Sequence, residues 1–444
     1  MSSKTQADTA HPSTVSPSTE ANPTTGHLVI IGNGMAAHRL VSRLKGRSGA
    51  PSHITLIGAE PHPAYNRILL SSWLAGDIER ESMALSLDDH TFPIVGQRLG
   101  TRVVNIDRRR QRVECDDGEI LCYDHLVLAT GSRSAMPEIP GIDLEGVHGF
   151  RDLDDAARLA AIAEAGGTAV VVGGGLLGLE AAAGLAGRGM QVSVVQRSSR
   201  VMNRQLDAVA ASMLATELGQ RGIALHTGAR LDAVIGDQGG KVSGVRLSGR
   251  STALEADCVV IAAGITPNIE LGQAAGLHCD RAIHVDDGLA TSDPRISAVG
   301  ECCQFGDSTY GLVEPIWRQV EILAARLSGQ AADTYSDKPC ATKLKVSGVD
   351  LYAFGPTEPD SDHEVLSYHD TGEYRRLLLR DGKLEGAVLY GDTRMGPWLF
   401  SLAEQGTCLD RVRHSLLLGQ ADTDALLSAH AAPHSDSSHH QDAA

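Results

Sequence analysis

Aromatic residues and paired cysteines are scarce in this chain. Phe, Trp and Tyr make up only 4% of its 444 residues, whereas 48 residues are glycine. This balance favours a glycine-rich α/β protein over an aromatic-rich β-sandwich. The eight cysteines form no CxxC or CxC pair, which argues against a zinc ribbon, an iron–sulfur cluster or a dithiol site. We therefore expect reduced thiols, no bound metal and a cytoplasmic location.

Positive charge and long apolar runs are also in short supply. The formal net charge is −16 at pH 7, which argues against nucleic acid as a partner. The most apolar stretch, around 170–190, contains Glu180, Arg188 and many glycines, so we expect no membrane span. Both ends of the chain are polar, and this composition predicts disordered tails at 1–26 and 426–444.

Two segments join a β-branched apolar run to a glycine turn and a helix-forming run. They are VIIGNGMAA, residues 29–37, and VVVGGGLLGLEAA, residues 170–182. In such a turn the first glycine allows a sharp bend, the second lets the backbone approach a pyrophosphate, and a small third residue lets helix pack on strand. These positions are Gly32, Gly34 and Ala37, and then Gly173, Gly175 and Gly178. One such turn also occurs without a ligand, but two predict two dinucleotide sites.

The end of the following strand distinguishes the two sites. After the first turn, HITLIGAE ends in Glu60, whose carboxylate can accept hydrogen bonds from an adenosine ribose. After the second turn, QVSVVQ ends in Gln196, and Arg197 and Arg200 follow. A carboxylate would repel a 2′-phosphate, whereas arginine attracts one. The second site therefore favours NADPH or tolerance of NADH and NADPH; alternatively, these arginines are ordinary solvated charges.

Five motifs in order complete the pattern: GNGMAA, ATGSR, GGGLLGLE, AAGITPN and AVGEC. Together they resemble the pyridine nucleotide-disulfide oxidoreductase superfamily of flavoprotein reductases. PAYNRILLSSWLAG, YGLVEPIWRQ and ATKLKVSGVDLYAFG further resemble the FAD-binding portion of assimilatory NAD(P)H nitrite reductase large subunits. They are also similar to the stand-alone flavoprotein partners of assimilatory nitrate reductases, and more distantly to rubredoxin and ferredoxin reductases. The resemblance covers about 27–406.

The resemblance implies an α/β fold of the glutathione-reductase type. It has two Rossmann-like dinucleotide-binding domains, with the NAD(P) domain inserted in the FAD domain, followed by a C-terminal α+β domain. We place the FAD domain at 27–143 and 266–335, and the NAD(P) domain at 144–265. The C-terminal domain, at 337–425, alternates like antiparallel strands and turns at Asp-Gly.

The resemblance also assigns the cofactors to residues. FAD would be bound by Gly32, Gly34, Ala37, Glu60, Arg67, Thr130, Gly131, Glu301 and Pro315. NAD(P) would be bound by Gly173, Gly175, Gly178, Glu180, Gln196, Arg197 and Gly264. Glu301 would hold ribityl hydroxyls, Arg67 would lie near the diphosphate, and a helix starting near Pro315 would point at the flavin. The alternatives are a surface acid, a solvated loop arginine and an ordinary helix start.

The absence of certain cysteines and of one lysine excludes some branches of the superfamily. No CxxxxC follows the first turn, and no cysteine precedes Cys115, so disulfide reductases and enzymes with a single redox cysteine near Ser71 and Ser72 do not fit. Ser72 also replaces a lysine that many relatives pair with the acid at Glu180. Cys302 and Cys303, beside the flavin motif, are interpreted as packing residues, although a redox role is conceivable.

Without a nucleophilic thiol, electrons must leave the flavin for another protein. We therefore expect an NAD(P)H-dependent FAD oxidoreductase, monomeric or homodimeric. It would feed an iron–sulfur partner, or a molybdenum or sirohaem reductase, in nitrate or nitrite assimilation. The alternatives are a rubredoxin or ferredoxin reductase of another pathway and a flavin redox sensor without turnover. The C-terminal domain, with Lys343 and Lys345, would cover the flavin and dock the acceptor; alternatively these lysines are only solvated strand residues.

Overall fold

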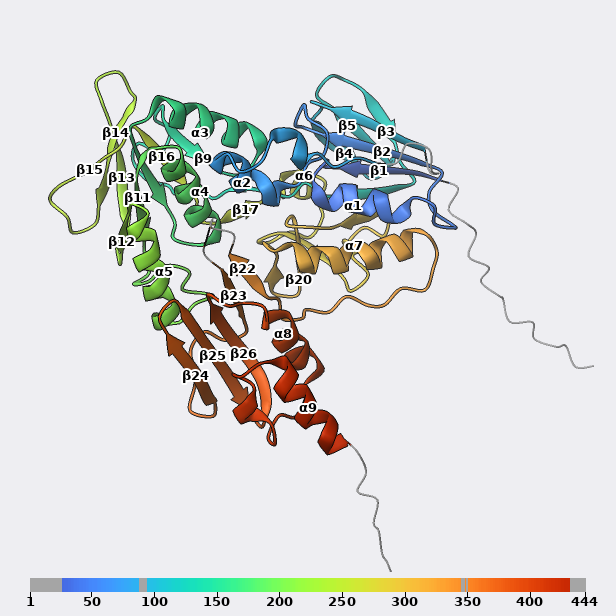
Figure 1. The fold of residues 1–444 in the computed structure, drawn as a ribbon. Coiled ribbons are helices and arrows are strands. Elements are labelled where there is room, and N and C mark those ends of the chain that lie inside the picture. The colour runs from blue at the N-terminus through green and yellow to red at the C-terminus, as the bar shows by residue number, and fades with distance from the viewer. Residues whose placement is uncertain (1–25, 88–93, 345–347, 349, 432–444) are drawn as a thin grey trace, which may run out of the picture.

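The computed structural model describes residues 26–87, 94–344, 348 and 350–431. The tail predicted at 1–26 therefore lies outside the described residues except for Gly26. Figure 1 shows two lobes side by side and a third lobe, the C-terminal part of the chain, projecting below them. Among the described helices, none combines the length and the apolar character that crossing a bilayer would require.

The first lobe is built on a five-stranded parallel sheet. Its order is β19 (Ile296–Ala298), β7 (His125–Leu128), β1 (His27–Ile31), β2 (His53–Gly58) and β3 (Ile94–Leu99). Helices α1 (Met35–Leu44) and α7 (Val313–Leu327) pack beside each other on it. The central strands are buried because helices and loops cover both faces, as parallel sheets require. The last strand to join, β19, comes from far along the chain.

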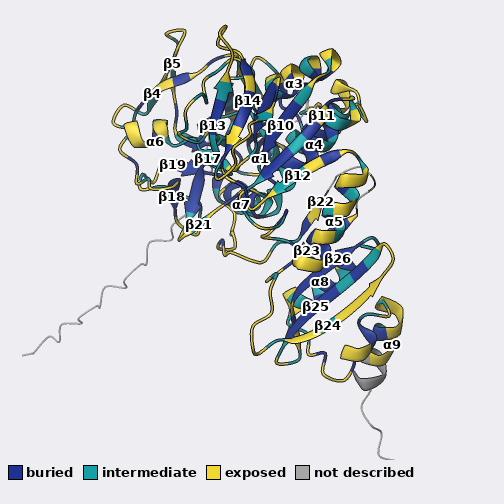
Figure 2. Ribbon diagram, turned by 90° about the vertical axis from the view of Figure 1, so that its left-hand side faces the viewer, coloured by how far each residue is buried: buried dark blue, intermediate teal, exposed yellow. Residues whose placement is uncertain are grey.

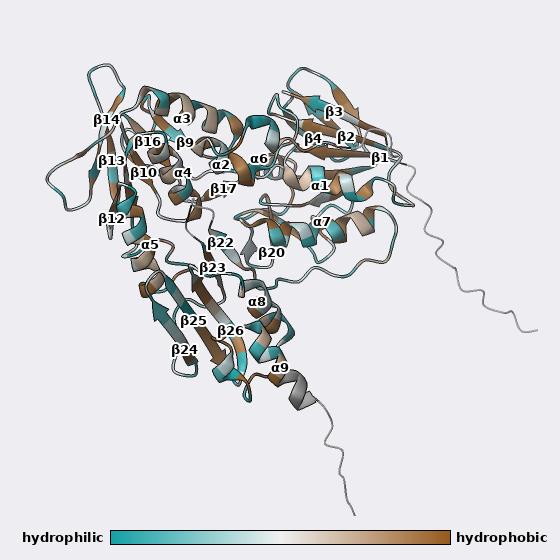
Figure 3. Ribbon diagram, in the orientation of Figure 1, coloured by the Kyte–Doolittle hydropathy of each residue, from teal (hydrophilic) through white to brown (hydrophobic). Residues whose placement is uncertain are grey.

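The second lobe repeats the plan with residues between those two stretches. Its parallel sheet has the order β12 (Ile223–Thr227), β11 (Gln191–Gln196), β10 (Thr168–Val172), β16 (Cys258–Ile261) and β9 (Val147–Gly149). Its helices are α3 (Leu153–Ala165), α4 (Leu176–Gly187) and α5 (Ala208–Gln220). Figure 3 shows hydrophobic residues along the strands of both lobes, and the apolar runs read from the sequence form the two cores. This is the predicted α/β fold with one unit inserted in the other.

Short elements surround the two large sheets. A two-stranded antiparallel pair, β8 (Ser132–Ser134) with β17 (Ile265–Pro267), connects the lobes where the chain leaves the first and returns to it. The remaining elements here are α2 (Leu70–Ala75), α6 (Glu270–Ala274), β4 (Val103–Asp107), β5 (Arg112–Cys115), β6 (Ile120–Cys122), β13 (Leu231–Gly236), β14 (Val242–Leu247), β15 (Leu254–Glu255), β18 (Ile283–Val285), β20 (Cys303–Phe305) and β21 (Ser308–Thr309). The domain boundaries at 143, 265 and 335 remain proposals.

The third lobe is an antiparallel sheet with helices. The order is β22 (Thr342–Leu344), β23 (Leu351–Phe354), β26 (Lys383–Tyr390), β25 (Glu373–Arg380) and β24 (Glu364–Asp370), and α8 (Gly396–Gln405) packs on it. Asp381 and Gly382 join β25 to β26 with φ of 48° and 69°, the left-handed pair that a two-residue hairpin turn needs. Figure 2 shows β24 as an exposed edge beside the buried strands.

One predicted boundary is wrong. The tail expected to begin at 426 is helical up to 431, because α9 runs from Gln420 to Ala431. Leucine and alanine in this segment favour helix, and its first half is anchored to the sheet's helices. Thr423 is fully buried, and the Trp398 indole N–H donates to Asp424 at 3.3 Å. Residues 432–444 lie outside the described part of the chain.

The first lobe carries a histidine that makes its stability depend on pH. Burial, with a smaller effect of Arg326, lowers the pKa of His125 to about 4, and its Nε2 lies 3.0 Å from Ser297 Oγ. The unfolded chain binds a proton near pH 6.5 and the folded chain does not, so stability falls as pH drops from 6.5 towards 4. We expect this histidine to cost about 2 kcal/mol on going from pH 7 to pH 5.

Chemical denaturation of wild type and His125→Gln at pH 7 and pH 5 measures that contribution. The variant should lose less stability than wild type over this interval. His53→Gln, at an exposed position of β2, is the control and should behave as wild type. Equal losses for wild type and His125→Gln would show that His125 does not carry the dependence.

Candidate functional site

A single cleft of about 2310 Å³ runs between the two large lobes and collects both glycine turns. The predicted residues that line it are Gly32, Gly34, Glu60, Arg67, Thr130, Gly131, Glu301, Gly173, Gly175, Glu180, Gln196, Arg197 and Gly264. Ala37, Gly178 and Pro315 do not line it. Ala37 and Pro315 are buried in helix packing, and a Cβ at Gly178 would lie 2.0 Å from the Gly173 carbonyl oxygen. The third turn positions thus serve helix–strand packing.

Each turn is a cradle that only glycine can form. Gly32 has φ +117° and a Cβ there would lie 2.1 Å from the Ala129 carbonyl oxygen; for Gly173 the values are +125° and 2.3 Å from the Ala262 carbonyl oxygen. Gly34 and Gly175 then precede α1 and α4, and within the described residues no side chain caps either helix. Unpaired N–H groups at two helix starts on one cleft fit two pyrophosphates.

The acid of the first site is held by its neighbours. Glu60 lies two residues beyond the end of β2 rather than on it. Its carboxylate accepts a hydrogen bond from the Tyr65 hydroxyl at 2.7 Å and pairs with Arg67. Arg67 also donates to the Arg151 carbonyl at 3.3 Å, and its Nε lies 3.9 Å from where a Cβ of Gly34 would be. Arg67 is therefore fixed beside the start of α1, not a solvated loop residue.

The acid of the AVGEC motif joins the lobes. Glu301 accepts a hydrogen bond from Ser132 Oγ at 2.9 Å and pairs with Arg151, which lies just before α3 in the other lobe. Only 14% of the Glu301 side chain is exposed, so it is not a plain surface acid. The sequence interpretation missed Arg151, because nothing local to it marks the contact. Ser132 lies in the ATGSR motif and carried a signal.

Thr130 and Gly131 lie where the two connecting segments meet. Thr130 Oγ1 donates to the Asn268 carbonyl at 2.8 Å, and Asn268 Nδ2 donates to the Thr130 carbonyl at 2.8 Å. Asn268 ends the AAGITPN motif and also lines the cleft. The reciprocal pair holds the two motifs together at the cleft. Helix α7 opens onto the same cleft at Val313 and Glu314, with no capping side chain in the described chain.

The second site is lined by a loop with three arginines. Gln196 ends β11 as predicted, and its side chain accepts from Gly174 N at 2.9 Å. Arg197 is exposed at the cleft and makes no ion pair with a described residue. Arg200 instead pairs with Glu358 at 2.5 Å and does not line the cleft. Arg204, missed from the sequence, is exposed and lines the cleft with Arg197.

Helices α2 and α4 meet at the cleft. Glu180 of α4 is 9% exposed and lines it. Ser71 of α2 also lines it, and its hydroxyl is buried without a hydrogen-bond partner among the described residues. Ser72, the position of the missing lysine, is not part of the lining. The position of the lysine that the resemblance implied thus lies outside the cleft lining.

Among the described residues, the third lobe reaches the cleft through β22 and the residue before it. Ala341, Thr342 and the exposed Lys343 line it, whereas β26 contacts α5 of the second lobe. That the C-terminal domain covers the flavin and docks the acceptor stays a prediction. Lys345 lies outside the described residues.

The cysteines of the described chain lie away from the cleft lining. None of the described residues that line it is cysteine. Cys302 and Cys303 are fully buried, and burial raises the pKa of both thiols, so neither is poised as a thiolate. In the described part of the chain, no group of His, Cys, Asp and Glu could hold a metal ion.

Comparison with known proteins identifies the family of this chain. The family model for pyridine nucleotide-disulphide oxidoreductases matches residues 26–322. The chain belongs to this family. A second model, for the rubredoxin NAD+ reductase C-terminal domain, matches residues 340–407. FAD and a nicotinamide dinucleotide are therefore its cofactors, and the two glycine cradles with uncapped helices fit them.

Two curated relatives come from Bacillus subtilis (strain 168). The nitrite reductase [NAD(P)H] is 38% identical over 85% of this chain and 47% of that protein. The assimilatory nitrate reductase electron transfer subunit is 39% identical over 83% of this chain and 48% of that protein. The chain thus spans about half the length of these relatives.

Solved structures share the fold. The covalent putidaredoxin reductase–putidaredoxin complex superposes with a TM-score of 0.80 at 24% identity, over 91% of this chain and 99% of that chain. The ferredoxin reductase for the CYP199A2 system of Rhodopseudomonas palustris gives a TM-score of 0.72 at 30% identity, over 82% of this chain and 91% of that chain.

Proposed function

We propose that this chain is an NAD(P)H-dependent FAD reductase that delivers electrons to a separate iron–sulfur protein. The observation that carries the proposal is the one cleft that holds both glycine turns and no described thiol. Bound FAD supplies hydride acceptance from a nicotinamide and release of electrons one at a time. With no thiol lining the cleft to receive them, the electrons go to an outside acceptor.

The residues of the cleft have separate tasks in this proposal. The starts of α1 and α4 hold the two pyrophosphates, with Arg67 adding positive charge at the first. Glu60 and Glu301 accept hydrogen bonds from hydroxyl groups of FAD. The start of α7 directs N–H donors and its dipole toward the flavin. Glu180, which lines the cleft, lies on the nicotinamide side in this proposal.

The acceptor is proposed from the relatives. Two of them are named as a nitrite reductase and as an electron transfer subunit of assimilatory nitrate reductase, which supports an iron–sulfur, molybdenum or sirohaem reductase partner in nitrogen assimilation. A rubredoxin or ferredoxin reductase of another pathway is the second candidate. It is supported by the rubredoxin reductase C-terminal match and by a Rhodococcus erythropolis rhodocoxin reductase, 37% identical over 81% of this chain.

Turnover with purified acceptors tests the proposal. FAD-loaded protein should reduce at least one iron–sulfur protein with NADPH or NADH, and a nitrite or nitrate reductase partner more rapidly than rubredoxin. Lys343→Glu should slow protein reduction but not dye reduction, because Lys343 lies at the cleft edge and steers an acidic partner. Lys383→Glu, exposed at the start of β26, is the control. Rapid dye reduction with no iron–sulfur protein reduced would favour a redox sensor.

We predict that NADPH is accepted at least as well as NADH. Arg197 and Arg204 line the cleft beyond β11, where a 2′-phosphate would attract guanidinium groups. Anaerobic stopped-flow bleaching of the flavin by each nucleotide measures the preference. Gln196→Glu with Arg197→Thr should shift it toward NADH, and glutamate can still accept the Gly174 N–H bond.

Arg246→Thr serves as the control for that pair, because Arg246 is exposed on β14 away from the cleft. A wild-type preference for NADH above about a hundredfold, or about 2.7 kcal/mol, would show that these arginines bind no phosphate.

A further inference from the structure

The loop between β11 and α5 carries the proposed phosphate arginines. We call residues 197–207 the nucleotide loop. Arg197 and Arg204 are exposed at the cleft, while Val201, Met202 and Leu206 are buried beneath them. Met202 has φ +49°, a left-handed conformation that a side chain adopts only where its surroundings enforce it. Met202 N donates to the Gly174 carbonyl at 2.8 Å, and the Met202 carbonyl accepts from Gln205 N and Leu206 N at 2.8 Å, so the glycine turn of the second lobe contributes to holding the loop.

The end of the loop is fixed by the third lobe. Asp207, 2% exposed, caps α5 by accepting from Ala210 N at 3.0 Å. The same carboxylate accepts from the Tyr374 hydroxyl at 2.5 Å and pairs with Arg376 at 3.0 Å. Both partners belong to β25, and Arg376 is 7% exposed. A buried charge of the second lobe is thus neutralised by a residue of the third.

A second contact holds the middle of the loop. Arg200 pairs with Glu358 at 2.5 Å and donates to the Leu206 carbonyl at 3.2 Å. Glu358 lies in the connection between β23 and β24. Arg376 also donates to the Thr357 carbonyl of that connection, so one guanidinium bonds to both sides of the interface.

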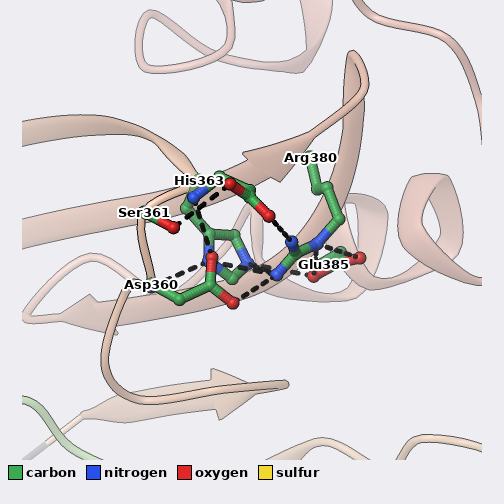
Figure 4. A network of polar contacts seen from close by, with 6 residues as sticks. Asp360, Ser361, His363, Arg380 and Glu385 are labelled. Carbon is green, nitrogen blue, oxygen red and sulfur yellow. Dashed lines mark hydrogen bonds and ion pairs between the residues drawn. The ribbon is translucent and has the colours of Figure 1, made fainter.

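The far end of the β23–β24 connection is fixed as well (Figure 4). Arg380 binds Asp360 at 2.6 Å and both carboxylate oxygens of Glu385 at 3.1 Å. His363 lies between the same two acids, at 2.9 Å from each. Glu358 is therefore presented to Arg200 by a segment that is bonded to its own sheet at both ends.

We infer that Tyr374, Arg376 and Glu358 of the third lobe are positioning residues for the nucleotide loop and set its selectivity for a 2′-phosphate. Through Asp207 and Arg200 they hold the loop in the shape that presents Arg197 and Arg204 to the cleft. A loop ordered before binding loses less conformational freedom when it binds. This inference rests on the proposed recognition of NADPH by Arg197 and Arg204.

The test removes two of the interactions between the third lobe and the nucleotide loop and keeps the buried ion pair between them. Tyr374→Phe with Glu358→Gln removes one hydroxyl and one charge and leaves the Asp207–Arg376 pair in place. Binding of NADP+ and NAD+ to the oxidised, FAD-loaded protein is measured by calorimetry. We expect the dissociation constant for NADP+ to rise about tenfold, equivalent to about 1.4 kcal/mol, and that for NAD+ to change less than twofold.

Tyr368→Phe with Glu364→Gln is a matched control on β24. The Tyr368 hydroxyl donates to Asp370 within its own strand, and Glu364 pairs with Arg413 on the surface. It should change neither dissociation constant. FAD content and thermal unfolding, measured on all variants, report whether the fold is intact.

The double variant Arg197→Ala with Arg204→Ala tests the proposed phosphate recognition separately from the positioning inference. If that variant leaves NADP+ affinity unchanged, the proposed phosphate recognition fails. If it weakens NADP+ binding but the Tyr374–Glu358 variant does not, only the positioning inference is wrong. The positioning inference is also wrong if the Tyr374–Glu358 variant loses the same affinity for NADP+ as for NAD+. It is wrong as well if that variant binds NADP+ more tightly because Arg200 has been released.

Discussion

Replacing Gly175 with alanine is expected to leave the fold intact and to weaken nucleotide binding strongly. Gly175 has φ −86°, which any residue adopts, and a Cβ there would meet no protein atom within 4 Å. The added methyl group would instead occupy the space before the uncapped start of α4, where a pyrophosphate must approach the backbone. The dissociation constant for NADP+ should therefore rise more than about a hundredfold, or about 2.7 kcal/mol.

The same helix supplies the control. Gly187→Ala, at the C-terminal end of α4, also meets no atom within 4 Å, and should be neutral or stabilising by about 0.5–1 kcal/mol because glycine weakens a helix. Calorimetry with NADP+, FAD content and thermal unfolding distinguish the variants. If Gly175→Ala binds NADP+ as tightly as wild type, the nucleotide does not approach α4 in the proposed manner.

Arg376→Leu should destabilise the contact between the second and third lobes by about 3–5 kcal/mol, because it leaves the Asp207 carboxylate buried without its cation. Only 8% of the Arg376 side chain and 4% of the Asp207 side chain are exposed. Chemical denaturation, compared with wild type, measures the loss.

Two further variants sharpen this measurement. Arg394→Leu removes an arginine that pairs with Asp392 at 2.7 Å but is 90% exposed, and no change should be detected. Asp207→Leu with Arg376→Leu should recover part of the stability, since no buried charge remains, but it loses the α5 cap, worth about 1 kcal/mol. A loss below about 1 kcal/mol for Arg376→Leu would show that water reaches Asp207.

The sequence predicted those features that local patterns determine. The β-branched runs before Gly32 and Gly173 are buried parallel strands, the residue at the end of β11 is Gln196, and the Asp381–Gly382 turn closes a hairpin. Each follows from side-chain periodicity or from the backbone freedom of glycine. The burial of Cys302 and Cys303 followed from their place in an apolar motif.

Contacts between distant segments could not be predicted in this way. Arg151 meets Glu301 across 150 positions, and Arg376 meets Asp207 from another lobe. Nothing in the residues around them distinguishes these arginines from solvated ones. Arg200 shows the opposite error: the sequence placed it among candidates for a phosphate, and a glutamate from the third lobe occupies it. The packing of the lobes determines the partners of all three arginines, and a single sequence does not show that packing.

The late arrival of β19 has a consequence for synthesis on the ribosome. This strand pairs with β7, yet roughly 170 residues separate them along the chain, and at 5–20 residues per second they emerge about 10–30 s apart. During that interval the second lobe is being translated, and the edge of β7 that later pairs with β19 has no partner. The nascent first lobe therefore has an unpaired strand edge until β19 is translated. A chaperone or early FAD binding would protect this edge from aggregation.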